Sequence, residues 1–135
     1  MENERKIPLW IVIYAIIQAL SSVVGVYGGY IDMSFFYAAQ FPDANFTDNL
    51  VKHLGGMWAS KNVGIIVVMA WSLIQRYPRV LGTVFAMKFI QDTIDILYVN
   101  NAFYTNVNIL QSVITWLLLG LPQAYAAYVL LRPSN

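Results

Sequence analysis

The chain has few of the residue types that carry metal or redox chemistry. It has no cysteine and a single histidine, His53, among its 135 residues. The missing cysteine excludes disulfides, thiol redox chemistry, and thiolate ligation of zinc or iron–sulfur clusters. One histidine cannot supply bis-histidine haem ligation, and the Glu-x-x-His ligand pairs of di-iron bundles are missing as well. We therefore expect no metal site and no cofactor beyond a bound lipid or quinone.

Charged residues are also scarce, at 11% of the chain, whereas hydrophobic residues make up 59%. A soluble domain carries roughly a quarter charged residues, so this composition indicates a membrane protein. The formal net charge is +1. Because no basic patch is available to replace the counterions of phosphates, we expect no nucleic-acid partner.

Four apolar segments are long enough to cross a bilayer, which takes about 20 residues of helix. They cover residues 8–30, 50–75, 80–99 and 109–131. We predict an all-α fold in which these segments form a four-transmembrane-helix bundle, with residues 1–135 making one membrane domain. We also expect a short interfacial helix in the first outer loop, over residues 34–41, because an aromatic run there ends at Pro42.

Four spans place both termini on the same side of the membrane. The basic residues collect on that side: Arg5, Lys6, Arg76, Arg79 and Arg132. The opposite side carries Lys52 against three acidic residues, Asp32, Asp43 and Asp48. By the positive-inside rule, this multi-pass protein has cytoplasmic N- and C-termini.

Small residues are concentrated at the end of the first segment, at Gly25, Gly28 and Gly29. Small side chains let the backbones of membrane helices approach closely. We therefore predict a close helix–helix contact at this end of the first span.

The third segment carries polar side chains at helical spacing, at Lys88, Gln91, Asp92 and Asp95. Lys88 and Asp92 are four residues apart, and Asp95 follows three residues later, so they share one face of a helix. An unpaired charge inside a bilayer costs several kcal/mol. We therefore expect this face to point into the bundle, into a cavity or onto a partner.

The second and third segments are joined by a tight turn at Tyr77, which makes them antiparallel neighbours. Lys61 and Asp92 lie at nearly equal distances from Tyr77 along the chain, so helices would bring them to about the same depth. We predict a Lys61–Asp92 ion pair between these segments. His53 falls on the same face of the second segment as Lys61, nearer its outer end.

We predict that the buried polar residues meet in one cluster, formed by Gln18, His53, Lys61, Lys88, Gln91, Asp92, Asp95 and Gln123. The cluster has two interpretations. As a set of interhelical ties it would fix the packing, with each tie contributing about 0.5–2 kcal/mol. As a functional site it would be a polar pocket reached from the bilayer.

Several short motifs are similar to those of the DoxX-like group of small four-helix membrane proteins. They are Gly55-Gly56, Lys61-Asn62-Val63-Gly64, the turn from Arg76 to Arg79, and Lys88-x-x-x-Asp92-x-x-Asp95. Some members of that group are linked to quinone-associated oxidation as accessory subunits. The resemblance implies such a setting here.

The function we expect is that of a non-catalytic subunit of a larger membrane complex, or of a binder of a lipid, quinone or pigment. Its partners would be membrane lipids together with other membrane subunits or a second copy. No nucleophile and base stand at a catalytic spacing, so we assign no catalytic residue. An alternative is a membrane enzyme of isomerase or hydrolase type, using Asp92 or Asp95 with Lys61 and Lys88. A second alternative is a proton or cation conductor.

Overall fold

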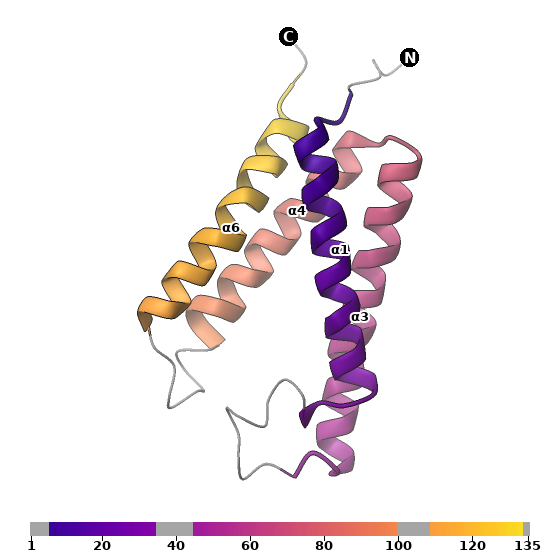
Figure 1. The fold of residues 1–135 in the computed structure, drawn as a ribbon, viewed down its shortest axis with the longest axis vertical. Helices are drawn as coiled ribbons and strands as arrows, with labels where there is room; N and C mark the ends of the chain where they lie inside the picture. The colour runs from indigo at the N-terminus through magenta and orange to yellow at the C-terminus, as the bar shows by residue number, and fades with distance from the viewer. Residues whose placement is uncertain (1–5, 35–44, 100–108, 134–135) are drawn as a thin grey trace. The chain divides into compact units, whose positions relative to one another are not determined.

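The computed structural model describes residues 6–34, 45–99 and 109–133, and within these ranges every regular element is helical. The helices are α1 (Leu9–Tyr30), α3 (Asn49–Ile74), α4 (Pro78–Thr93), η1 (Ile94–Val99) and α6 (Ile109–Leu131) (Figure 1). The all-α class is therefore confirmed for the described residues, with helix ends close to the predicted segments. The predicted interfacial helix lies, apart from Ser34, outside the described residues.

Three helices are long and apolar enough to cross a membrane: α1, α3 and, within α6, Ser112–Leu131. The membrane class predicted from composition fits these helices. The third predicted segment is helical too, but it is divided into the 16-residue α4 and the six-residue π-helix η1. Alone, α4 is shorter than the roughly 20 residues that a span requires.

The chain forms two compact units, which we describe separately. One unit, Pro8–Trp71, contains α1 and most of α3; the other contains Met1–Ile7 and Ser72–Asn135, with α4, η1 and α6. The prediction of a single membrane domain concerns how these units combine, and it stays a prediction.

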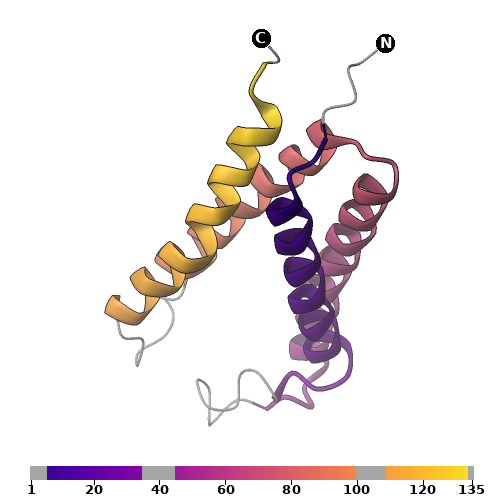
Figure 2. The same ribbon diagram turned by 45° about the horizontal axis from the view of Figure 1, so that its top comes forward.

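In the first unit, α1 and α3 lie side by side and antiparallel (Figures 1 and 2). A methyl carbon built on Gly29 would lie 2.5 Å from the carbonyl oxygen of Gly55 and 2.6 Å from the Cβ of Ala59. A methyl carbon on Gly25 would lie 3.0 Å from the Trp58 ring. The two helices can approach this closely only because these positions have no side chain, which confirms the predicted helix–helix contact.

The N-terminus of α3 is fixed by a cap. The carboxylate of Asp48 accepts a hydrogen bond of 2.7 Å from the backbone N–H of Leu50. A side-chain acceptor at this position satisfies one of the backbone donors that a helix leaves open at its start. The polar turn before α3 thus determines where the helix begins.

The C-terminus of α3 has a left-handed residue, Arg76, with φ of 56°. The N–H of Tyr77 donates to the carbonyl oxygen of Ser72 at 2.9 Å. The N–H of Arg76 donates to the carbonyl oxygen of Leu73 at 3.3 Å. This pair of bonds is the Schellman motif, in which glycine usually takes the left-handed position. The turn into α4 is therefore tight, and arginine adopts an unfavourable backbone conformation there.

In the second unit, α4 and α6 pack antiparallel (Figure 2). A methyl carbon on Gly82, near the start of α4, would lie 2.9 Å from the Cβ of Leu130, near the end of α6. At the other end of the pair, the indole N–H of Trp116 donates to the hydroxyl of Thr93 at 2.8 Å. The Trp116 ring also contacts Phe89, with ring centres 6.1 Å apart. The contact therefore extends over most of the length of α4.

Candidate functional site

The polar face predicted on the third segment contains an ion pair. The Lys88 ammonium lies 3.4 Å from Oδ1 of Asp92, one turn further along α4. The two side chains are only 10% and 17% exposed. Both charges are thus largely removed from the surface, and each partly compensates the other.

The second oxygen of Asp92 is bound from α6. The amide Nε2 of Gln123 donates to Oδ2 of Asp92 at 2.6 Å. Gln123 is fully buried. Each oxygen of the Asp92 carboxylate therefore has a donor, one from its own helix and one from α6, and the Gln123 bond ties the two helices together. We call Lys88, Asp92 and Gln123 the polar network.

One atom of the polar network has no partner. The amide oxygen Oε1 of Gln123 is buried and accepts no hydrogen bond within the described structure. Turning the amide over would place this oxygen against the Asp92 carboxylate, acceptor against acceptor, so the Asp92 bond fixes its orientation. A buried acceptor without a donor costs about 1–3 kcal/mol. Gln123 thus has both a structural contact and an unused acceptor.

Two further predicted residues lie near the polar network along the chain. Gln91 is half-buried on α4, and Asp95 is half-buried in η1. The π-helix begins directly after Thr93, whose hydroxyl donates to the carbonyl oxygen of Phe89 at 2.6 Å. Such back-bonding by Thr competes with the regular helix pattern. The wider π turn also changes the angle between Asp92 and Asp95 from that of an α-helix.

The remaining predicted residues belong to the other unit. Gln18 is buried, and its Nε2 donates to the Tyr14 hydroxyl at 2.9 Å, so this amide is engaged within α1. His53 and Lys61 are exposed on α3. A Lys61–Asp92 pair would join the two units and stays a prediction. Within its own unit, Asp92 already has Lys88 and Gln123 as partners.

Sequence reasoning missed two of the side-chain contacts that hold the helix pairs together. One is the Trp116–Thr93 bond described above. The other joins the hydroxyls of Tyr30 and Ser60 at 2.6 Å, between α1 and α3. A signal was present for Trp116, because an indole N–H in an apolar helix needs an acceptor. The sequence alone did not indicate which acceptor it would find.

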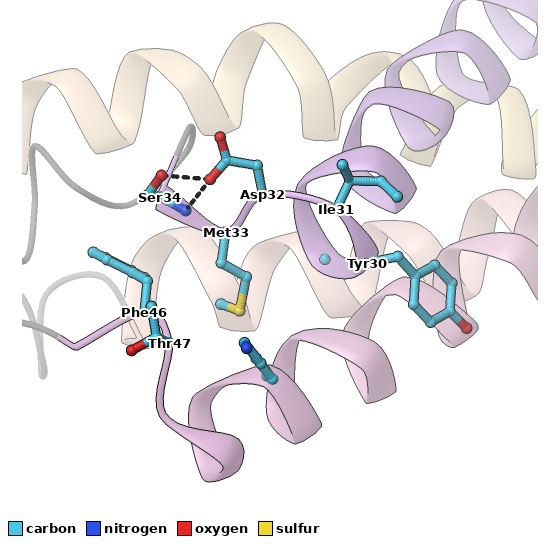
Figure 3. A pocket seen from close by; sticks show the side chains of 9 residues that line it. Tyr30, Ile31, Asp32, Met33, Ser34, Phe46 and Thr47 are labelled. Atoms are coloured by element: carbon cyan, nitrogen blue, oxygen red, sulfur yellow. Dashed lines mark hydrogen bonds between the residues drawn. The ribbon is translucent and has the colours of Figure 1, made fainter.

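A pocket of about 540 Å³ lies where α1 ends and α3 begins. Its lining includes the charged residues Asp32 and Lys52, the polar Ser34, and the apolar Met33 and Phe46. Figure 3 shows the Asp32, Met33 and Ser34 side chains from the segment after α1, with Phe46 on the segment before α3. The pocket combines both signs of charge with apolar surface. No sequence motif had indicated a site here.

Among the described residues, no group of three or more His, Asp or Glu side chains is placed to hold a metal ion. Comparisons with protein-family models, with curated proteins and with solved structures found no match for this chain. The likeness to the DoxX-like group therefore stays a prediction.

Proposed function

We propose that this chain is a multi-pass membrane protein with four spans and cytoplasmic termini. The three long apolar helices support this placement, and so does the helical continuity of α4 and η1 from Pro78 to Val99. At about 1.5 Å per residue, a helix over that range would be roughly 30 Å long, comparable to the hydrocarbon core of a bilayer. The basic turn at Arg76 and Arg79 supports a cytoplasmic position for that end.

Within the membrane, we propose that the protein is non-catalytic and holds a lipophile or a partner subunit against the polar network. The observation that carries this proposal is the unused acceptor at Gln123 Oε1, buried beside Asp92. A ligand hydroxyl or a donor from a partner would satisfy this acceptor and remove its desolvation cost. Asp92, one of the two acids on which an enzymatic or conducting role would depend, is engaged on both oxygens.

Purification in a gentle detergent, followed by mass spectrometry, tests the proposal. We expect the wild-type protein to retain a lipid, quinone, pigment or protein partner. Gln123→Met removes the acceptor while keeping the side-chain length, and it should lower the retained amount at least fivefold. Gln75→Met, at an exposed glutamine in the turn after α3, is the matched control and should have no effect.

Three outcomes would contradict the proposal. A strictly monomeric protein that retains neither protein nor lipophile would argue against a binding function. Equal retention by wild type and Gln123→Met would show that binding does not depend on the polar network. A proteoliposome flux that disappears in Asp92→Asn would instead favour the conducting alternative.

A further inference from the structure

The pocket between the end of α1 and the start of α3 is built entirely by the Pro8–Trp71 unit. Its volume of about 540 Å³ lies within the range of about 300–1,000 Å³ that small-molecule sites occupy. It is far along α1 from Gln18 and contains no member of the polar network. It is therefore a separate candidate site.

The pocket presents an acid and a base together. Asp32 lines it from the segment after α1, and Lys52 lines it from the first turn of α3. Figure 3 shows Ser34 beside the Asp32 carboxylate, which accepts hydrogen bonds from the Ser34 N–H at 3.0 Å and from the Ser34 hydroxyl. These contacts hold the Asp32 carboxylate in place at the pocket.

The apolar side of the pocket is fixed by close packing. The Met33 side chain lies against Gly55, where an added methyl carbon would collide with its sulfur. A methyl carbon on Gly55 would also lie 2.9 Å from the carbonyl oxygen of Gly29, so both helices constrain this wall. On the α3 side, Thr47 is held by a hydrogen bond of 2.6 Å from its hydroxyl to Asn45 Oδ1. The lining is thus anchored on both sides.

An exposed apolar stripe on α1 leads to the pocket. Its members recur every three or four residues, so they share one face of the helix, and each is at least 48% exposed: Ile13, Ile17, Leu20, Val24, Tyr27 and Ile31. Ile31 itself lines the pocket. At about 1.5 Å per residue, the stripe is roughly 27 Å long, close to the thickness of a bilayer's hydrocarbon core.

We infer that the pocket binds the head group of a zwitterionic phospholipid that carries a primary ammonium, with its acyl chains along the α1 stripe. Lys52 would bind the phosphate, and Asp32 would accept hydrogen bonds from the ammonium. The Asp32 carboxylate would repel a purely anionic head group, and the Lys52 ammonium would repel a purely cationic one. The stripe favours a lipid over a soluble zwitterion, because a soluble molecule makes no use of it. This inference rests on the membrane placement proposed above.

The test uses the full-length protein in nanodiscs of phosphatidylcholine, titrated with phosphatidylethanolamine and phosphatidylglycerol and read by native mass spectrometry. We expect phosphatidylethanolamine to bind at least tenfold more tightly than either of the other lipids. Lys52→Met should weaken its binding about tenfold. Asp32→Asn should abolish the preference over phosphatidylglycerol. Lys6→Met, the same substitution at an exposed lysine before α1, should change neither value.

Ser34→Ala provides a second variant that keeps both charges, in case Asp32→Asn does not fold. It should reduce the preference about threefold, because it removes one of the bonds that orient Asp32. Equal binding of the three lipids by wild type would overturn the inference, as would an unchanged preference in both Asp32→Asn and Ser34→Ala. Competition by free phosphoethanolamine at the same concentration as the lipid would overturn the lipid assignment. A protein that enters nanodiscs but shows no preference refutes this site alone, whereas failure to enter them refutes the membrane placement.

Discussion

The helix pairs α1–α3 and α4–α6 are held together by different kinds of contact. At Gly29 and Gly55 the first pair brings backbone against backbone, with no space for a methyl group. The second pair also has a small residue at its contact, Gly82, but adds the bond from Gln123 to Asp92 across the helices. The first pair has a cross-helix bond as well, between the exposed hydroxyls of Tyr30 and Ser60, but its closest contact depends on missing side chains. The second pair depends more on the chemistry of buried side chains, so substitutions should affect the two pairs in different ways.

The largest effect should come from breaking the ion pair of the second unit. Asp92→Leu leaves the Lys88 ammonium without its partner in a poorly hydrated place, and removing one member of a buried pair costs about 3–5 kcal/mol. The double variant Lys88→Met/Asp92→Leu should recover at least half of the loss. The thermal midpoint in detergent measures both. Single variants as stable as wild type would show that the pair is hydrated.

The same cycle with Lys61 tests the pairing predicted from the sequence. The observed contacts predict that Lys61→Met costs little and does not rescue Asp92→Leu, because Lys88 is the lysine at 3.4 Å. If Lys61→Met instead costs about 3–5 kcal/mol and rescues Asp92→Leu, Lys61 and Asp92 are paired across the two units.

A smaller loss is expected in the first unit from Gly29→Ala. Its methyl group would need the space of the Gly55 carbonyl oxygen at 2.5 Å, and such overpacking costs about 1–3 kcal/mol. Gly64→Ala is the matched control, because a methyl group there meets no atom within 4 Å. That variant should gain about 0.5–1 kcal/mol from helix propensity. Equal melting temperatures for the two variants would contradict the close contact.

Trp116→Phe should cost about 1 kcal/mol, since it removes the bond to Thr93 while keeping a ring against Phe89. Thr93→Val removes the other partner of the same bond. A double-mutant cycle of detergent melting temperatures should therefore show that the two losses are not additive. Additive losses would mean that the bond does not contribute to stability.

A gain as small as that of Gly64→Ala is expected from Arg76→Gly. Arg76 has φ of 56°, a conformation that costs a residue with a side chain about 1–2 kcal/mol, and glycine is the usual residue there. Allowing for the greater freedom of glycine in the unfolded chain, we expect a gain of about 0.5–1 kcal/mol. Arg79→Gly, inside α4, should instead be destabilising.

The sequence was sufficient for the features that depend on local periodicity. The helix ends, the Lys88–Asp92 spacing and the glycine contact all follow from patterns within one segment or from residue size. The partner of Asp92 on α6 did not follow. Distance along the chain from a turn predicts which residues of neighbouring helices lie at the same depth, and many residues share each depth. Which of these residues are in contact depends on how each helix is rotated about its own axis. Asp92 therefore contacts Gln123, which the sequence placed only in the same broad cluster.

The local hydrogen bonding around Thr93 limited the prediction in another way. The sequence pattern predicts regular α-helical spacing through Asp95, whereas the π-helix η1 begins at Ile94. The position of the pocket could not be predicted from the sequence either. Asp32 and Lys52 belong to different segments and line one pocket only when α1 and α3 pack together.

The polar network has a consequence for how the protein would be made. A Lys or Asp at the centre of a helix costs about 2.5–3.5 kcal/mol for entry into the bilayer through the translocon. If α4 and η1 form a membrane span, as proposed above, α4 would enter poorly as a single helix, because it carries both Lys88 and Asp92. The α6 amide that bonds Asp92 is synthesised later. We therefore expect α4 to wait at the translocon until α6 emerges and to enter with it as a hairpin, whereas α1 can enter alone. A nascent chain truncated before Gln123 should leave α4 outside the bilayer.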